Sequence, residues 1–329
     1  MKNFYKTGVM SSKILIIGAC GQIGSELTVR LRAIYGEENV VASDIREGNP
    51  DIVNTGFFEI VDAKNYTSVK NCVEKHNIDT VYLMAAMLSA TGEKHPMKAW
   101  DLNMDSLFHV LNLAKEKIIS KVFWPSSIAV FGTTTPKENT PQYTVMEPST
   151  VYGMTKQVGE RWCEYYYNKY GVDVRSLRYP GIISWKTLPG GGTTDYAVEI
   201  FHKALSEKRY DCFLNEDTKL PMMFMDDAID ATVGIMSAKF EDIKIRSSYN
   251  LAAISFTPKE IAECVKKHIP EFEMGYSVDY RQDIASSWPK SIDDSCARQD
   301  WEWQHKFELE DITKEMLFQL DKNRNKVSE

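Results

Sequence analysis

A tyrosine and a lysine four residues apart form a candidate proton-abstracting pair. Tyr152 and Lys156 lie in a segment that predicts a helix, where residues at this spacing are neighbours on one face. A nearby cation favours the phenolate and so lowers the pKa of a tyrosine from its usual value of about 10. Such a tyrosine can take a proton from an alcohol near neutral pH. The spacing alone is common in helices, so the hypothesis needs support from other residues.

A glycine-rich turn gives the first support. Gly18 to Gly24 has glycine at every third position, between a predicted strand and a predicted helix. Such glycines let the backbone approach a pyrophosphate at a helix N-terminus, although for the glycines alone a purely structural turn is the alternative. Asp44 ends the next predicted strand, where its carboxylate favours NAD over NADP, with Arg46 close behind. Asp62, after another short apolar segment, is a candidate for contact with the adenine.

A pair of serines gives the second support. Ser126 and Ser127 end a predicted strand, at the edge where open α/β sheets bind ligands. A hydroxyl there can hold the substrate oxygen while Tyr152 removes its proton, and Lys156 is also expected to bond the nicotinamide ribose. Ser127 as a turn residue and Lys156 as a solvated charge are the alternatives for each residue alone. Their order along the chain favours the catalytic interpretation.

Composition excludes several other classes of protein. The chain has 329 residues, of which 43% are hydrophobic and 26% charged, as is typical of a soluble globular protein. The longest apolar run, at 81–88, is far shorter than the roughly 20 residues that span a bilayer. A net charge of −7 without a basic block disfavours nucleic-acid binding. We therefore expect neither a membrane nor a nucleic acid as a partner.

The cysteines and histidines have no metal-binding or disulfide pattern. Six of each are scattered along the chain, which predicts no metal site and a reducing compartment, the cytoplasm. The first dozen residues contain lysines and no acid. An alternative start at Met10 is favoured there over an organelle leader, which would direct the chain to the mitochondrial matrix.

Apolar runs and amphipathic segments alternate in the N-terminal half. The predicted strands are 13–17, 40–43, 80–84, 122–125 and 174–178, and the predicted helices are 21–35, 100–117 and 150–170. This alternation predicts an α/β fold with a doubly wound, Rossmann-type parallel sheet. Later segments predict helices at 194–205 and from residue 226, and a strand at 249–252. We expect an NAD-binding domain at 12–180, joined by 225–253, and a smaller substrate-binding lobe at 181–224 and 254–320.

The chain resembles the extended short-chain dehydrogenase/reductase superfamily from residue 13 to about 320. The resemblance rests on Gly18, Gly21, Gly24, Asp44, Ser127, Tyr152 and Lys156. It implies a Rossmann domain with a C-terminal substrate lobe. It also implies a homodimer formed through a helical bundle that contains the Tyr152–Lys156 helix.

A narrower resemblance is to the short-chain type of L-threonine 3-dehydrogenase. It rests on segments 88–94, 100–104, 148–153, 180–185, 188–196 and 287–294, of which the last two fall in the expected lobe. It implies the metal-independent, NAD-dependent oxidation of L-threonine to 2-amino-3-oxobutanoate in threonine catabolism. Tyr152 would be the base and Lys156 would lower its pKa. The residues expected around the substrate are Ser89, Ser126, Ser127, Tyr152, Thr194 and Trp288.

Two parts of the expected lobe are further candidates for contact with the substrate. Segment 190–195 is expected to offer N–H groups and hydroxyls to the substrate carboxylate, with a flexible connection as the alternative. Trp288 is expected to close over the substrate and exclude water, with core packing as the alternative.

The expected cofactor site extends beyond the glycine turn. The candidate cofactor-binding residues are Gly18, Gly21, Gln22, Ile23, Gly24, Asp44, Ile45, Arg46, Asp62, Ala63, Asn103, Tyr152, Lys156 and Ile182.

Two other functions remain open at this point. A sugar-nucleotide epimerase or dehydratase shares the Tyr/Lys pair but must bind a diphosphate, for which Arg281 and Arg298 are available among nearby aspartates. A non-catalytic dinucleotide sensor is the second alternative, and the intact Tyr/Lys pair disfavours it.

Overall fold

The structure, a computed structural model, describes residues 12–48, 50–190 and 192–327. The chain forms two compact units: unit 1 comprises Met1–Met87, Trp100–Pro125 and Arg161–Arg175, and unit 2 comprises Leu88–Ala99, Ser126–Glu160 and Ser176–Glu329. Unit 2 thus includes residues 88–99, 126–160, 176–180 and 225–253, which were expected in the NAD-binding domain, and the functional boundary at residue 180 stays a prediction. Residues 1–11, which include the start-site and leader question, lie outside the described residues.

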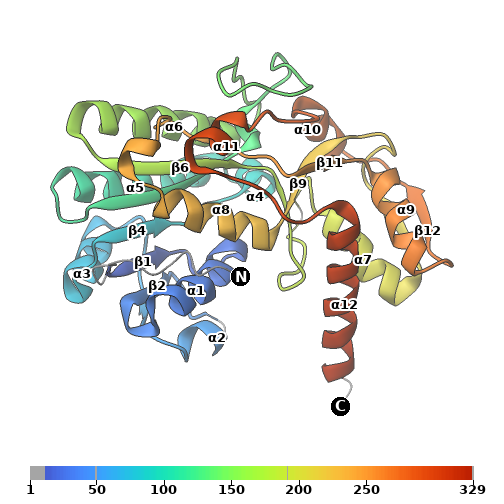
Figure 1. Cartoon of the computed structure of the whole chain (residues 1–329), viewed down its shortest axis with the longest axis horizontal. Coiled ribbons are helices and arrows are strands. Elements are labelled where there is room, and N and C mark those ends of the chain that lie inside the picture. The colour runs from blue at the N-terminus through green and yellow to red at the C-terminus, as the bar shows by residue number, and fades with distance from the viewer. Residues whose placement is uncertain (1–11, 49, 191, 328–329) are drawn as a thin grey trace. The chain divides into compact units, whose positions relative to one another are not determined.

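A seven-stranded sheet has the order β10-β6-β5-β4-β1-β2-β3 and is mostly parallel, which confirms the predicted doubly wound fold (Figure 1). The four residues of β1 are buried, as is typical of a parallel strand covered on both faces. The strands are β1 (Ile14–Ile17), β2 (Val40–Asp44), β3 (Phe58–Ile60), β4 (Thr80–Leu83), β5 (Lys121–Ser127), β6 (Asp173–Tyr179) and β10 (Tyr249–Asn250).

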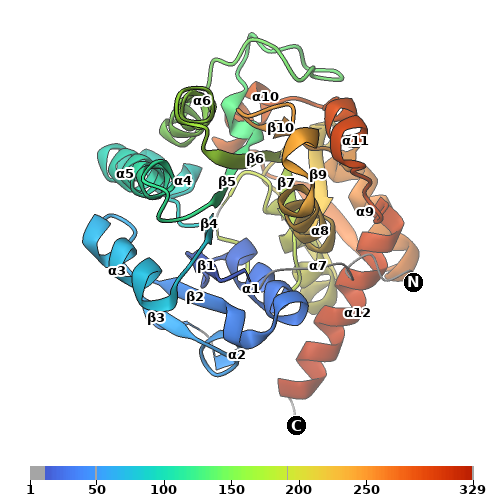
Figure 2. The same ribbon diagram turned by 60° about the vertical axis from the view of Figure 1, so that its left-hand side comes forward.

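Helices cover both faces of the strands of unit 1. Figure 2 shows α1 on one face and α3 on the other. In α1, Leu27 and Leu31 are fully buried, which anchors the helix that follows the glycine turn. The sequence did not predict α3, which begins after Asn65 caps the backbone N–H of Ser68. The helices with residues in unit 1 are α1 (Gln22–Tyr35), α2 (Pro50–Val53), α3 (Tyr66–His76), α5 (Pro96–Lys115) and α6 (Val151–Tyr170), with a 3₁₀ turn η1 (Glu37–Asn39).

Unit 2 contains two small sheets, β11-β9-β7 and β12-β8, and a hydrophobic core that includes Tyr196 and Phe201. Its further strands are β7 (Gly181–Ile183), β8 (Arg209–Cys212), β9 (Leu220–Phe224), β11 (Ile254–Phe256) and β12 (Glu273–Tyr276). Its further helices are α4 (Ser89–Lys94), α7 (Tyr196–Glu207), α8 (Met225–Ser237), α9 (Pro258–His268), α10 (Arg281–Ser287), α11 (Ser295–Trp301) and α12 (Leu309–Val327), with 3₁₀ turns η2 (Ile128–Val130) and η3 (Phe240–Asp242).

The helices around this core begin with clear local signals. Thr257 and Glu260 form a capping box at the start of α9, and Pro258 occupies its first turn. Helices α7, α9 and α12 pack against one another beside the core. Within the described ranges, no helix combines the length and the hydropathy needed to cross a bilayer.

Candidate active site

The glycine turn of unit 1 follows β1 and leads into α1. Gly18 has a φ of +89°, a backbone conformation that favours glycine. A Cβ atom at Gly18 would lie 2.5 Å from the backbone nitrogen of Ala85, and one at Gly24 would lie 2.2 Å from the carbonyl oxygen of Gly18. Side chains at either position would therefore fill the turn. The turn leads directly into the N-terminus of α1, which favours an anion such as a pyrophosphate, so these residues fit the binding of NAD.

Asp44 is held beside this turn by backbone amides. One of its carboxylate oxygens accepts a hydrogen bond from the Cys20 N–H at 3.0 Å, and the other accepts one from the Ile45 N–H at 2.8 Å. Each oxygen keeps further acceptor capacity for a ribose hydroxyl. Ile45 and Arg46 are exposed. The geometry therefore suits the predicted role of Asp44 in binding the adenosine ribose.

The remaining candidates of unit 1 make local contacts. Asp62 accepts a hydrogen bond from the Lys64 N–H at 2.9 Å. The Asn103 side chain is buried and bonds both the N–H of Met87, at 2.8 Å, and its carbonyl oxygen, at 3.2 Å. Asn103 thereby holds the chain that follows β4. Contacts of Gln22, Ile23, Asp62, Ala63 and Asn103 with the cofactor stay predictions.

In unit 2, α6 lies directly against the end of β5. Ser127 is the last residue of β5, and its hydroxyl accepts a hydrogen bond from the Ala129 N–H at 3.2 Å, which caps η2. A Cβ atom at Gly153 would lie 2.2 Å from the carbonyl oxygen of Ala129. Only glycine permits this close approach, and it brings the neighbouring Tyr152 to Ser127.

The Ser127 hydroxyl lies beside the Tyr152 phenol and forms a hydrogen bond with it. The catalytic roles of both residues stay predictions. The Nζ atom of Lys156 lies 5.5 Å from the centre of the Tyr152 ring. Burial raises the pKa of Tyr152 to about 12, while the hydrogen bond with Ser127 acts in the opposite direction. The predicted lowering of this pKa is therefore wrong for this structure, because the loss of solvation of the phenolate outweighs the effects that favour it.

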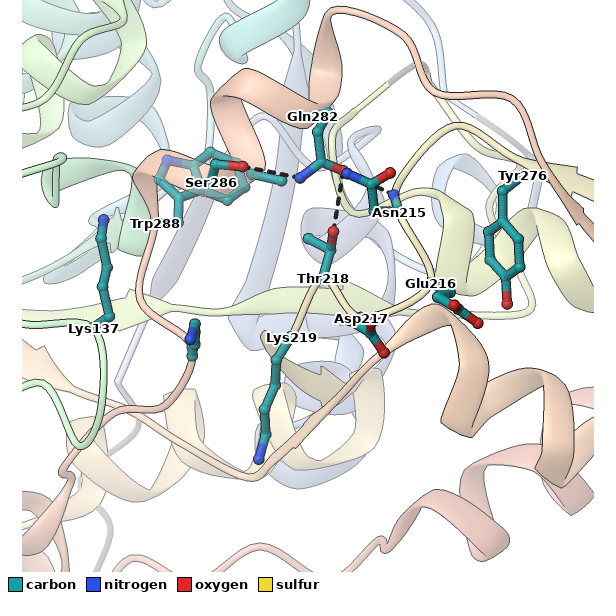
Figure 3. A pocket seen from close by; sticks show the side chains of 12 residues that line it. Lys137, Asn215, Glu216, Asp217, Thr218, Lys219, Tyr276, Gln282, Ser286 and Trp288 are labelled. Atoms are coloured by element: carbon teal, nitrogen blue, oxygen red, sulfur yellow. Dashed lines mark hydrogen bonds between the residues drawn. The ribbon is translucent and has the colours of Figure 1, made fainter.

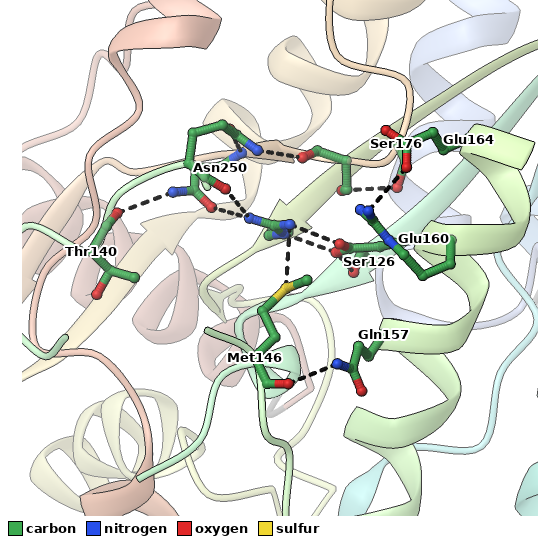
Figure 4. A network of polar contacts seen from close by, with 12 residues as sticks. Ser126, Thr140, Met146, Gln157, Glu160, Glu164, Ser176 and Asn250 are labelled. Carbon is green, nitrogen blue, oxygen red and sulfur yellow. Dashed lines mark hydrogen bonds and ion pairs between the residues drawn. The ribbon is translucent and has the colours of Figure 1, made fainter. Parts of the chain in front are cut away.

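Ser126 takes part in a different set of contacts. Its side chain is buried, and its hydroxyl donates a hydrogen bond to Oε1 of Glu160 at 2.6 Å (Figure 4). Glu160 also forms a buried ion pair with Arg178, at 2.7 Å. We leave Ser126 out of the proposed substrate site, because its hydroxyl is engaged by this pair. The pair was not predicted from the sequence, although Glu160 follows Lys156 by one helical turn and so shares its buried face.

Ser89, a candidate for contact with the substrate, lies in a helix. It is the first residue of α4 and is buried. One turn later, Glu93 accepts a hydrogen bond from the Val151 N–H at 2.8 Å, and Val151 is the first residue of α6. The helix that carries Ser89 thereby caps the helix that carries Tyr152.

Thr194 lies next to β7, in a loop that contains an internal hydrogen bond. A Cβ atom at Gly181 would lie 2.7 Å from Cγ2 of Thr194, which places this threonine beside the strand that holds Ile182. The Gly192 N–H donates to the Asp195 carboxylate at 2.7 Å, so this N–H is engaged within the loop and is not presented to a substrate carboxylate as expected. Gly191 lies outside the described residues.

Trp288 follows α10 and is nearly buried, with 8% of its surface exposed. It belongs to the core cluster against which Tyr152 packs, and it also lines a pocket of about 630 Å³ (Figure 3). In this pocket Lys137 donates hydrogen bonds to the carbonyl oxygens of Gly132 and Ser287, and burial lowers its pKa. The pocket is lined by Lys137, Asn215, Glu216, Asp217, Thr218, Lys219, Tyr276, Gln282, Ala285, Ser286, Trp288 and Lys290.

Comparison with known proteins decides the family. Residues 14–252 match the model of the NAD dependent epimerase/dehydratase family. The chain belongs to this family. It is accordingly an enzyme of the NAD-dependent epimerase/dehydratase superfamily, with NAD as its cofactor, and the resemblance to extended short-chain dehydrogenases is confirmed.

Relatives in this family cover almost the whole chain. An uncharacterized epimerase/dehydratase of Staphylococcus haemolyticus is 48% identical over 95% of this chain and 99% of its own length. The holo form of the GalE-like L-threonine dehydrogenase of Cupriavidus necator has a TM-score of 0.91 and 53% identity, over 94% of this chain and 99% of its own. The L-threonine dehydrogenase of Clostridium difficile has a TM-score of 0.93 and 46% identity, over 95% and 98%. The predicted likeness to L-threonine 3-dehydrogenases is therefore confirmed.

Proposed function

We propose that the protein oxidises L-threonine at its 3-hydroxyl to 2-amino-3-oxobutanoate, with NAD as the acceptor, as a step of threonine catabolism in the cytoplasm. The observation that carries this proposal is the 46–53% identity to solved L-threonine dehydrogenases over nearly the full chain. The hydrogen-bonded Tyr152 and Ser127, with Lys156 beside the ring, supply the groups that the reaction needs.

Each residue of the group has a distinct task. Ser127 orients the threonine hydroxyl through its own hydroxyl group, and Tyr152 accepts the proton of that hydroxyl. The ammonium of Lys156 stabilises the negative charge that the tyrosine carries before it accepts the proton. NAD, when bound, accepts the hydride from C3, so threonine loses two electrons and two hydrogens in all.

The substrate is small, and the proposed residues around it suit that size. Ser89 and Thr194 offer hydroxyls to the charged groups of threonine. Trp288 belongs to the core cluster against which Tyr152 packs. In this position it excludes water from the reacting hydroxyl. Exclusion of water strengthens the electrostatic interactions on which the proton transfer depends.

The sugar-nucleotide alternative has weaker support in the lobe. Such a substrate requires cations for its diphosphate. Arg281 pairs with Asp279 at 2.7 Å and stacks over the ring of Phe213, and Arg298 pairs with Asp294 at 2.7 Å. Both candidate arginines are thus already neutralised by carboxylates of the chain.

A single assay separates the alternatives. We expect NADH absorbance to appear when the purified protein is incubated with NAD and L-threonine. Incubation with NAD and UDP-glucose should give neither NADH nor UDP-galactose. Conversion of the sugar nucleotide without oxidation of threonine would overturn the proposal in favour of the epimerase. NAD binding without turnover of any alcohol would favour the dinucleotide sensor.

We also propose that the protein forms a homodimer through the aromatic face of α5 and α6. Trp162 and Tyr165 on α6 are 37% and 41% exposed. The rings of Trp162 and Phe108 are in edge-to-face contact, with their centroids 5.0 Å apart. An exposed aromatic cluster on adjoining helices is typical of an interface. Sedimentation should give a dimer that Trp162→Asp converts to a monomer. Phe318→Asp, at an exposed aromatic on α12, is the control and should remain dimeric.

A further inference from the structure

The catalytic segment of α6 is attached at two places, once to η2, which directly follows β5, and once to the end of β5 itself. The first is the close approach of Gly153 to Ala129, described above. The second is the hydrogen bond from Ser126 to Glu160, at 2.6 Å. Lys156 lies between these two attachments, and Tyr152 directly precedes the first of them. Ser126 directly precedes Ser127, so the second attachment also fixes the strand end that presents the catalytic hydroxyl.

Glu160 is the acceptor on which this second attachment depends. Its side chain is fully buried, and its two carboxylate oxygens receive three donors: the Ser126 hydroxyl, and Nε and Nη2 of Arg178 at 2.8 and 2.7 Å. The bidentate geometry between a guanidinium and a carboxylate fixes direction as well as distance. Burial of a carboxylate costs desolvation free energy even when every oxygen has a hydrogen-bond partner. This cost is consistent with a role in fixing the geometry of the site.

Arg178 has no N–H left without an acceptor. Besides its two bonds to Glu160, it donates to the carbonyl oxygen of Gln142 at 3.1 Å, to Oδ1 of Asn250 at 2.9 Å and to the Met146 sulfur at 3.4 Å. Figure 4 labels two of these partners, Met146 and Asn250, with the dashed lines that reach them. A fully satisfied guanidinium is rigid, so it holds Glu160 in one position.

The network also reaches the chain that follows Trp288. The Asn250 amide donates to the carbonyl oxygens of Thr140 and Asp293, both at 3.1 Å. Thr140 in turn donates its N–H to the carbonyl oxygen of Ser291 at 2.9 Å. The same polar cluster therefore supports the end of β5, the catalytic helix and the segment that carries Trp288.

We propose that Glu160, held by Arg178 and bonded to Ser126, is a positioning residue that sets Ser127 and Lys156 relative to Tyr152. This inference rests on the proposed function in taking Tyr152 as the base. Glu160 touches no reacting atom in this role. The charged group recorded beside the Tyr152 ring, among the described residues, is the Lys156 ammonium, and the charged group facing Glu160 is Arg178. Movement of the helix relative to β5 therefore changes the surroundings of the phenol.

Glu160→Gln is the most direct test. An amide of the same shape places an NH₂ group where three donors converge, so at least one donor loses its acceptor. We expect kcat to fall by about 10- to 100-fold, the loss typical of a misplaced catalytic group, with KM for NAD changed by less than about twofold. The acid limb of the pH profile of kcat should also move by at least about half a pH unit, because the surroundings of Tyr152 differ.

Ser126→Ala is the milder test, and it answers the question even if Glu160→Gln fails to fold. It removes a single oxygen and keeps the ion pair. We expect the same direction of change in kcat and in the acid limb, with a smaller fall in kcat of about 3- to 10-fold. An unaltered pH profile in a folded Ser126→Ala protein would overturn the proposal.

A second ion pair on β6 provides the matched control. Arg175 lies on the same strand as Arg178, is 1% exposed and pairs with Asp173 at 3.0 Å. Asp173→Asn should lower the melting temperature, as Glu160→Gln should, but leave kcat within about twofold and the acid limb in place. If kcat and the pH profile change equally in the two variants, loss of any ion pair at β6 is sufficient to lower the activity. That result would reject a positioning role for Glu160.

A readout without turnover separates this inference from the proposed function. The ring carbon that bears the hydroxyl can be followed by NMR in protein labelled with ¹³C-tyrosine, with the Tyr152 signal assigned by its loss in Tyr152→Phe. Glu160→Gln should shift the titration of this signal, and Asp173→Asn should not. If the wild-type protein fails to oxidise threonine while this shift is present, the proposed substrate is wrong and the positioning role stands. If threonine is oxidised and no shift occurs, the positioning role is wrong.

Discussion

The ammonium nitrogen of Lys156 lies 5.5 Å from the centre of the Tyr152 ring, one turn further along α6. Lys156 is 2% exposed, so its charge is poorly screened by water. Burial nevertheless leaves the phenol with a pKa of about 12. The pair therefore favours a proton-abstracting tyrosine whose working form becomes more populated as the pH rises.

Removal of the Tyr152 hydroxyl should abolish turnover. In Tyr152→Phe no group remains to take the substrate proton, and we expect kcat to fall by about a thousandfold, within the range found for loss of a general base. Binding of NAD, measured by fluorescence titration, should change by less than about threefold. Tyr143→Phe is the control, since Tyr143 is 76% exposed. A Tyr152→Phe protein with near-normal kcat would show that another group is the base.

The rate should increase with pH because the active form of Tyr152 is deprotonated. Burial raises its pKa from about 10 to about 12, so at neutral pH the folded protein holds the phenol protonated. Below that pKa, the deprotonated fraction rises tenfold per pH unit. We expect log kcat/KM for threonine to rise between pH 7 and 9 with a slope near one. A plateau that begins below pH 8 would contradict a raised pKa in the working enzyme.

The elements of unit 1 show what a sequence pattern can predict. Strand β1 is a continuous apolar run, and β2 and β4 are largely apolar segments of four or five residues, so each has the pattern of a short buried strand. Strand β3 was missed because it is short, and its Ile60 is 57% exposed, so it lacks the pattern of a buried strand. Helix α3 was missed because its apolar face is small, with Val69 and Val73 among the few buried residues.

Site residues could be predicted from the sequence where a local motif requires one residue type. They could not be predicted where contacts between distant parts of the chain determine their role. Gly18 and Gly24 are needed for backbone reasons that a local motif reveals. Glu160 and Arg178 lie 18 positions apart, and charged residues in such segments normally face solvent. The direction of the Tyr152 pKa shift was mispredicted for a related reason, because burial depends on packing that the sequence does not specify.

Gly24 should be essential for binding NAD. In Gly24→Ala the new methyl group would approach the Gly18 carbonyl oxygen within 2.2 Å, so the turn must open. We expect affinity for NAD to fall by at least about tenfold, which corresponds to about 1.4 kcal/mol. Gly234→Ala is the matched control, because it also lies in a helix and its nearest contact would be an ordinary 3.5 Å to Trp301. It should bind NAD normally, and normal binding by Gly24→Ala would show that the turn is not the pyrophosphate site.

The charge of Asp44 should set the preference for NAD over NADP. Asp44→Asn keeps the shape of the side chain and an oxygen that can accept the hydrogen bond from Cys20, but it removes the charge that repels a 2′-phosphate. We expect the ratio of the dissociation constants for NADP and NAD to fall by about tenfold, as for the loss of one partly screened charge interaction. Asp105→Asn, at an exposed position of α5, removes the same charge elsewhere and should leave the ratio unchanged.

Salt dependence distinguishes charge repulsion from a change of shape at Asp44. Repulsion between exposed charges weakens as ionic strength rises, because the screening length falls from about 10 Å at 0.1 M to about 3 Å at 1 M. The preference of the wild-type protein for NAD should therefore decrease with added salt, whereas the ratio in Asp44→Asn should change little. If both proteins respond equally to salt, discrimination arises from the hydrogen bonds of Asp44 to the ribose and not from its charge.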